Sequence, residues 1–210
     1  MADWATISSL ATAAGTLVLA GATFSAVRSS NRSARIAEQA LQEQRRPVLV
    51  QARLDDPMQK VMFADGHWIR AEGGQVAVDE AEGTLYLGVA IRNAGAGIAV
   101  LQGWHIWPDL VRADVDHPPP EDFRRQGRDI YVAPGDIGLW QGALREADGE
   151  VTREIAAARA ERRAFTIDLL YSDQVGGQRT ISRFGVWPAG DDRWLGSAGL
   201  HWNLDRPGPR

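Results

Sequence analysis

The chain has 210 residues, a net charge of −4 and no cysteine. Without cysteine it has no disulfide, thiolate metal site or cysteine nucleophile, and an acidic chain lacks the basic surplus of a general nucleic-acid binder. Its basic residues are nearly all arginine, because Lys60 is the single lysine. The length is sufficient for one well-buried domain of ordinary size beside an N-terminal helix.

The N-terminal segment from Ala5 to Val27 carries no charged residue over 23 positions. A helix of that length spans roughly 34 Å, which exceeds the hydrocarbon core of a bilayer, roughly 30 Å thick. A soluble helix normally has a charged face, and a signal peptide has a positive N-terminal region where this chain has Asp3. We therefore expect a retained membrane helix over residues 1–28. A cleaved signal peptide and a buried soluble helix are the alternatives.

The charges that flank this segment predict its orientation. Arg28, Arg32 and Arg35 follow it, whereas only Asp3 precedes it. Positive residues stay on the cytoplasmic side, so we expect a single-pass protein of the inner membrane with its N-terminus outside and its body in the cytoplasm. Trp4 lies where an interfacial aromatic anchor belongs, and each arginine gains on the order of 1 kcal/mol beside anionic lipid.

Small residues recur at a spacing of four within the same segment. Ala11 is followed by Gly15, and Gly21 is followed by Ser25. Small residues at this spacing let helix backbones approach closely in lipid. The pattern predicts self-association or packing on another membrane protein, although a run this rich in Ala and Gly also produces such pairs by chance.

Residues 29–46 are rich in helix formers and predict a juxtamembrane helix, which Pro47 ends. Residues 47–204 change to a β pattern with frequent turn signals, such as Asp65-Gly66. In residues 83–93, apolar residues alternate with others, as in a strand that is buried on one face. Further strands are expected at 47–54, 59–64, 67–70, 75–80, 98–107, 165–172 and 179–187, with shorter ones in DIYVA, IGLWQGAL and the last part of the domain.

One stretch near residues 150–162 is rich in Ala, Glu and Arg and predicts a short helix. Many short strands, with one helix inserted, predict a mainly β fold. We expect an antiparallel immunoglobulin-like sandwich, preceded by the long N-terminal helix and followed by a disordered tail over residues 205–210.

The arrangement resembles uncharacterised bacterial single-pass membrane proteins with an immunoglobulin-like β-sandwich body. The resemblance is carried by the N-terminal segment, the helix that ends at Arg46-Pro47, IRNAGAGIAVL (91–101), the APGD turn (133–136) and LLYSDQVGGQRTISRF (169–184). It implies a fold and a location but no activity, since sandwich folds host many unrelated functions.

Imidazoles and carboxylates gather in one stretch, the kinds of side chain that a metal site or an acid–base pair uses. Their spacing fits no helix-based pair of ligands, and the surrounding prolines indicate a surface loop, where Asp usually serves turns or solvation. These weak candidates are His105, Asp109, Asp114, Asp116 and His117.

Two further features have structural interpretations. The glycine-containing loop NAGAG (93–97) follows a strand, but the next residues continue as strand, whereas a phosphate loop requires a helix start there. A glycine turn or bulge is therefore the favoured interpretation. Trp104 and Trp107 are three residues apart, so on one strand they point to opposite faces.

No motif specifies a reaction, and no catalytic residue, metal or cofactor is expected. The favoured hypothesis is a membrane-anchored, non-enzymatic β protein that binds a protein partner or supports an assembly at the cytoplasmic membrane face. One alternative is a membrane-tethered hydrolase that uses the loop carboxylates and histidines. The other is a glycan- or surface-binding domain outside the cytoplasm.

Overall fold

The computed structural model describes residues 4–145, 149–190 and 192–206, so the end of the expected tail lies outside the described residues. In the first helix, the side chains of residues 4–7, 9 and 11 are also outside that description. Contacts divide the chain into two units, and the boundary falls between Gln44 and Arg45. The first unit is a helix, and the second is a β-rich body.

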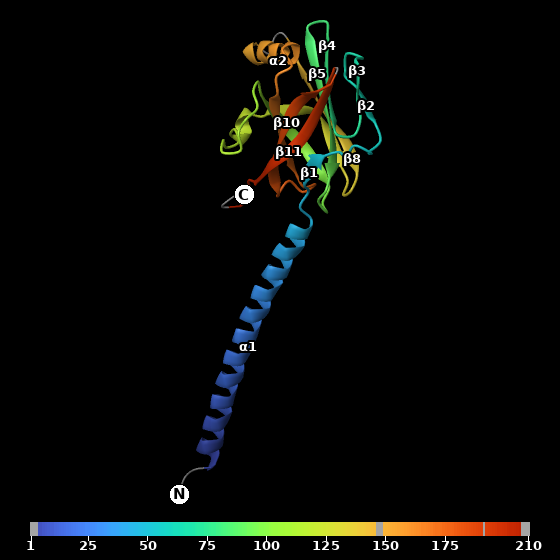
Figure 1. Cartoon of the computed structure of the whole chain (residues 1–210). Coiled ribbons are helices and arrows are strands. Elements are labelled where there is room, and N and C mark those ends of the chain that lie inside the picture. Colours follow the sequence, from blue (N-terminus) through green and yellow to red (C-terminus); the bar gives the residue numbers. More distant parts are fainter. Residues whose placement is uncertain (1–3, 146–148, 191, 207–210) are drawn as a thin grey trace. The chain divides into compact units, whose positions relative to one another are not determined.

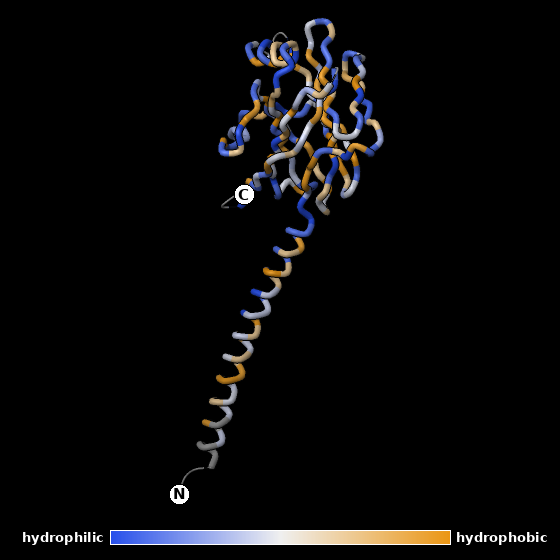
Figure 2. Tube along the Cα trace, in the orientation of Figure 1, coloured by the Kyte–Doolittle hydropathy of each residue, from blue (hydrophilic) through white to orange (hydrophobic). Residues whose placement is uncertain are grey.

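Helix α1, Trp4–Gln44, runs without interruption through both segments in which the sequence predicts helix (Figure 1). It ends three residues before Pro47, whose ring disfavours the α conformation in the residue before it. Apolar residues recur along α1 with polar ones between them (Figure 2). Among the residues that the structure describes, no helix combines the length and the apolar composition that crossing a bilayer requires.

In the described part of the body, nine strands form one antiparallel sheet and two more form a separate hairpin. The order in the sheet is β1-β5-β4-β11-β10-β9-β6-β7, and β8 also pairs with β5. The strands of the sheet are β1 Leu49–Gln51, β4 Gln75–Ala81, β5 Thr84–Asn93, β6 Ala99–Trp107, β7 Arg124–Val132, β8 Ile137–Leu144, β9 Phe165–Ser172, β10 Arg179–Ala189 and β11 Arg193–Asn203. The hairpin strands are β2 Gln59–Met62 and β3 Trp68–Ala71.

Strand β5 organises the sheet because it pairs with three other strands. β8 pairs with residues 85–92 of β5, β4 with residues 84–89 and β1 with residues 91–93. A strand has two edges, so β4 and β1 lie end to end on one edge while β8 occupies the other. The two ends of the sheet, β7 and β8, are consecutive in the chain, and the sheet is therefore curled.

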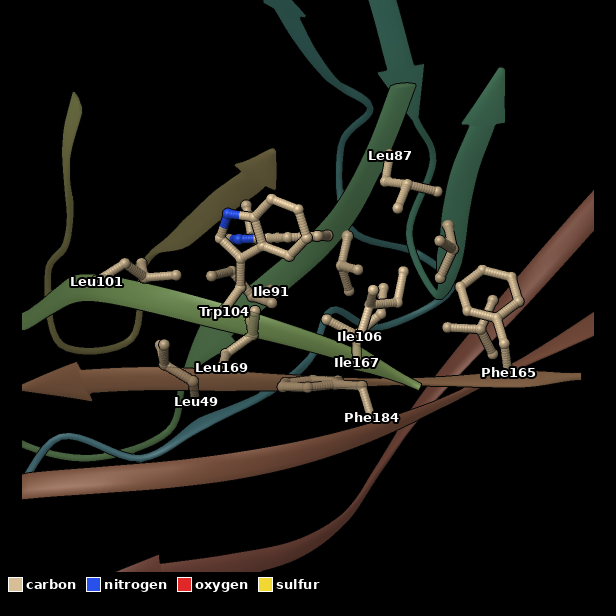
Figure 3. Close-up of a cluster of buried hydrophobic side chains, with 14 of the residues drawn as sticks. Leu49, Leu87, Ile91, Leu101, Trp104, Ile106, Phe165, Ile167, Leu169 and Phe184 are labelled. Atoms are coloured by element: carbon tan, nitrogen blue, oxygen red, sulfur yellow. The ribbon is translucent and has the colours of Figure 1, made fainter. Parts of the chain in front are cut away.

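The curled sheet surrounds the main hydrophobic core, which draws side chains from nearly every strand (Figure 3). Trp104 and Trp140 meet edge to face there, with ring centroids 5.5 Å apart. The mainly β, antiparallel prediction is confirmed. The immunoglobulin-like sandwich is not confirmed, because the main strands hydrogen-bond into one continuous sheet and not into two sheets packed face to face.

Parts of the sheet are buried on both faces. The outer face of β5 and β8 is covered by the hairpin β2–β3, which forms a second apolar cluster with Tyr86, Ala90 and Leu139. Period-two alternation predicts one exposed face for β5, whereas nearly all of its residues are buried. The difference arises because the β2–β3 hairpin, which forms no ladder with β5, packs against the outer face of β5 and buries it.

Helix α2, Glu150–Ala160, confirms the short helix that the sequence predicts. Its Ile155 and Ala158 are buried, and the Thr152 hydroxyl donates to the Arg145 carbonyl at 2.9 Å. The expected hairpins 59–70 and 165–187 are confirmed by the antiparallel pairing of β2 with β3 and of β9 with β10.

The glycine-containing loop NAGAG holds the chain where it enters the body. The buried Asn93 amide accepts hydrogen bonds from the backbone N–H groups of Val48 at 3.2 Å and Gly95 at 3.0 Å. The same amide donates to the carbonyls of Gly97 at 2.6 Å and Val132 at 2.9 Å. One side chain therefore joins the entering chain, its own loop and the end of β7, and the interpretation as a structural turn agrees with this geometry.

The glycines of this loop are required by a close backbone approach. A Cβ atom at Gly95 would overlap the carbonyl of Arg46, and one at Gly97 would overlap the carbonyl of Arg45. Because both obstacles are backbone, rotation of a side chain cannot relieve the overlap.

We predict that Gly95→Ala lowers the free energy of unfolding by about 1–3 kcal/mol, the usual penalty of overpacking. The matched control is Gly199→Ala on β11, where an added Cβ meets nothing within 4 Å. Urea unfolding followed by tryptophan fluorescence measures both. Equal urea midpoints for the two variants would show that the close backbone approach at Gly95 does not require glycine.

Candidate functional site

The loop carboxylates that the sequence offers as candidates do not converge. Asp109 is exposed and pairs with Arg163 at 3.0 Å, and Asp114 is exposed and pairs with Arg112 at 3.4 Å. Asp116 also has an exposed side chain. Exposed pairs of this kind contribute little stability.

The two histidines of the same group each pack against a tryptophan. On β6, His105 packs against Trp107 with ring centroids 4.8 Å apart, and burial lowers the pKa of its imidazole. The His117 ring packs edge-on against Trp202 at 5.5 Å, and its Nδ1 lies 2.8 Å from the Pro118 carbonyl oxygen. Across the described residues, no three His, Asp or Glu side chains are placed to hold a metal ion.

A buried polar cluster of the body, which sequence reasoning missed, is the ion pair between Asp168 on β9 and Arg183 on β10. Arg183 Nε donates to one carboxylate oxygen at 2.8 Å, and Nη2 donates to the other at 2.9 Å. Both residues are buried, and the Trp107 indole N–H donates to the same carboxylate at 2.9 Å. The residues are 15 apart and β9 pairs with β10 at this position, so only the strand register brings them together.

The guanidinium of Arg183 also fastens the long loop between β6 and β7. It donates to the backbone carbonyls of Val115 at 2.7 Å and Asp116 at 3.2 Å, and its centre lies 4.8 Å from the Trp202 ring centroid. Each charge therefore has its partners, which a buried ion pair requires. Trp107 faces this outer cluster while Trp104 lies in the inner core, so the expectation of opposite faces is confirmed.

A serine–histidine contact lies inside the curled sheet. Ser182 Oγ is 2.7 Å from His201 Nδ1 and 2.9 Å from the Tyr171 hydroxyl, which accepts from the Leu49 N–H at 3.1 Å. Burial lowers the pKa of His201 and raises the pKa of Tyr171. Ser182 is fully buried, so no substrate reaches its hydroxyl, and the chain of hydrogen bonds serves the core.

Several surface hollows lie on the described part of the body, and two of them are lined by four arginines each. One, of about 630 Å³, lies among β3, β4, the end of α2 and the β10–β11 turn. The other, of about 470 Å³, follows the gap between β7 and β8. The first contains both acidic and arginine side chains, including Asp79 and Asp192, whereas no acidic residue is among the described residues that line the second.

On α1, the basic residues Arg28, Arg32 and Arg35 are exposed. The side chains of Trp4 and Ala11 lie outside the described residues. Gly15 and Gly21 have open space around them, and Ser25 Oγ donates to the Ala22 carbonyl at 3.1 Å. Helix packing through these small residues stays a prediction.

No protein-family model and no curated protein matches the chain. A solved structure to which it is similar is a crystal structure of a protein from Archaeoglobus fulgidus. The two are 7% identical, with 71% of this chain and 96% of that chain covered, and the TM-score is 0.24. A likeness at that score carries no argument.

We predict that Asp168→Leu lowers the free energy of unfolding by about 3–5 kcal/mol, because it leaves the Arg183 charge buried without its counter-ion. The double variant Asp168→Leu with Arg183→Met should recover part of that loss. Asp114→Leu, at an exposed carboxylate, is the control and should change stability by less than about 1 kcal/mol. Urea unfolding measures all three, and a double variant no more stable than the single one would contradict the charge-based account.

Proposed function

We propose that this chain is a membrane-anchored, non-enzymatic binding protein. Helix α1 inserts into the inner membrane, and the β-rich body binds a partner at the cytoplasmic face. The observation that carries the proposal is the exposure of large apolar side chains on several sides of α1, within a segment that has no charge.

The apolar side chains of α1 point in several directions. Leu17, Val18, Leu19 and Phe24 are 74%, 71%, 69% and 70% exposed. Consecutive residues of a helix are about 100° apart, so Leu17 to Leu19 alone cover more than one face. A single partner helix covers one stripe, whereas lipid covers every side. Burying each such side chain stabilises by about 1.5–3 kcal/mol, which favours a lipid environment.

The polar residues of the same segment are largely satisfied within the helix. The hydroxyls of Thr12, Thr16 and Thr23 donate to the carbonyls four residues earlier, at 2.8–2.9 Å. Side chains that bond to their own helix leave fewer unmet hydrogen-bonding groups for lipid to surround. These hydroxyls lower the average hydropathy of the segment while adding little to the cost of inserting it.

The binding role of the body is supported by the positions of its polar groups. Most candidate residues of a hydrolase are engaged with arginine side chains or the backbone. A binding role needs only an accessible surface, and the gap between β7 and β8 offers one.

We predict that the full chain floats with lipid vesicles and that Leu17→Asp with Leu19→Asp abolishes flotation. Each charge at the centre of a membrane helix costs about 2.5–3.5 kcal/mol. The matched control is Ile36→Asp with Leu41→Asp, the same change in the part of α1 that is expected to lie outside the bilayer, and it should still float. A wild-type chain that stays with the soluble fraction would end the membrane proposal.

The orientation has a separate test. Because Arg28, Arg32 and Arg35 follow the apolar segment, we predict that protease added to intact spheroplasts spares the body and digests it after the membrane is permeabilised. Digestion of the body in intact spheroplasts would instead favour the extracytoplasmic alternative. A known periplasmic protein, cleaved in both conditions, shows that the protease is active.

A further inference from the structure

In the described part of the body, the curled sheet is not closed by a backbone ladder between β7 and β8. Near their turn the two strands are close, because a Cβ at Gly138 would lie 2.7 Å from a methyl carbon of Val132. Across the described residues, however, neither strand appears in a backbone ladder with the other. β7 pairs with β6 and β8 pairs with β5, so each has one edge that faces the gap.

Side chains of β7 take the place of the missing ladder. Arg124 Nη1 donates to the Ala143 carbonyl at 3.4 Å, and Gln126 Nε2 donates to the Gln141 carbonyl at 3.1 Å. Arg128 Nη2 reaches the Gln141 side-chain oxygen at 3.2 Å. These contacts show that the backbone carbonyls of Gln141 and Ala143 point into the gap and accept hydrogen bonds there.

The β8 edge therefore has the pattern that strand addition uses. In a strand, the N–H and C=O of one residue point to the same side, so the N–H groups of Gln141 and Ala143 also face the gap. Gln126 Oε1 is a buried atom on the same groove and has no hydrogen-bond partner among the described residues. An incoming backbone offers donors and acceptors to all of these groups.

The groove is positively charged although the chain as a whole is acidic. The described residues of its lining include four arginines and no carboxylate: Arg124, Arg125, Arg128 and Arg145. Arg145 also lies 3.5 Å from Asp65, outside the lining. Met62, Phe63 and Trp104 add an apolar part to the wall.

The hollow of about 630 Å³ beside the end of α2 shows that arginines alone do not make such a site. There, Arg159 pairs with Glu80 at 3.0 Å, Arg162 lies 4.0 Å from Asp192, and Asp79 also contributes to the lining. Two of its four arginines are therefore paired with carboxylates. The β7–β8 groove differs because no acidic residue is among the described residues of its lining and because it runs along a strand edge.

We propose that the β7–β8 groove binds an extended, acidic segment of a partner protein, which adds as a strand to the free edge of β8. The partner's backbone N–H groups donate to the Gln141 and Ala143 carbonyls and displace the side chains that now occupy them. Its carboxylates face the arginines, and its apolar residues on the other side contact Met62 and Phe63. This inference deepens the proposed binding function and rests on it.

The test measures binding of a fluorescent peptide of alternating Glu and Val to the full chain in detergent micelles, by anisotropy at low salt. Two probes separate charge from backbone pairing. A Lys–Val peptide has the same strand propensity and the opposite charge. A Glu–Pro peptide has the same charge, but half of its residues have no backbone N–H. We expect the Glu–Val peptide to bind at least about tenfold more tightly than the Lys–Val or the Glu–Pro peptide. Its affinity should fall with added salt.

Variants of the chain place the site. Arg125→Glu with Arg128→Glu should weaken Glu–Val binding about tenfold or more and improve Lys–Val binding. Ala143→Pro removes an edge N–H without changing charge and should weaken Glu–Val binding similarly. The control is Arg70→Glu with Arg193→Glu, which alters the other hollow and should leave binding unchanged. Urea midpoints confirm that each variant is folded; if Ala143→Pro is not, the Glu–Pro comparison decides the role of the backbone.

Three results would overturn the inference. Equal binding of the Glu–Val and Glu–Pro peptides would indicate an anion site only. The other two are an equal loss of Glu–Val affinity in the Arg70 and Arg193 control variant, and no binding of the Glu–Val peptide at all. None of them affects flotation of the chain, so failure of this inference is distinguishable from failure of membrane anchoring.

Discussion

The body depends on one constraint, which is that its sheet curls around a core and still needs cover on much of its outer face. β5 and β9 are buried along almost their whole length, so neither strand has one face in the core and the other in water. Two separate segments meet the need for cover. The hairpin β2–β3 lies over β5 and β8, and the loop between β6 and β7 lies over β9 and β10.

The β2–β3 hairpin and the β6–β7 loop are held in place by different kinds of interaction. The hairpin is held by apolar packing, with Phe63 and Tyr86 edge to face at 4.8 Å, which is non-directional and tolerates substitution of similar volume. The loop is held by Arg183, whose guanidinium is fixed by Asp168 and donates to loop carbonyls. A buried pair of charges contributes little net stability, but it penalises any arrangement that leaves one charge unpaired. It therefore selects a single position for the loop.

This difference explains what the sequence reveals and what it does not. Local signals predicted the long N-terminal helix, the helix at α2 and both hairpins, because turn residues and helix formers act over a few positions. The continuous sheet was not predictable, since the pairing of β4 with β11 and of β6 with β9 depends on contacts distant in sequence. For the same reason Asp168 and Arg183 look like unremarkable charged residues in strand patterns. Only their hydrophobic flanks, such as Leu169 and Leu170 beside Asp168, hint at a buried carboxylate.

The open edge between β7 and β8 has a simpler structural interpretation, which is protection. Natural sheets often place charged side chains at free edges to prevent edge-to-edge association. The arginines of the groove do this against a second copy of the chain, because two such edges would bring like charges together. The same charges attract a strand of opposite sign, so protection from self-association and selection of an acidic partner arise from one set of side chains. The gap does not need to close in the isolated chain, because Arg124 and Gln126 already satisfy the β8 carbonyls, and a partner has only to exchange those hydrogen bonds for its own.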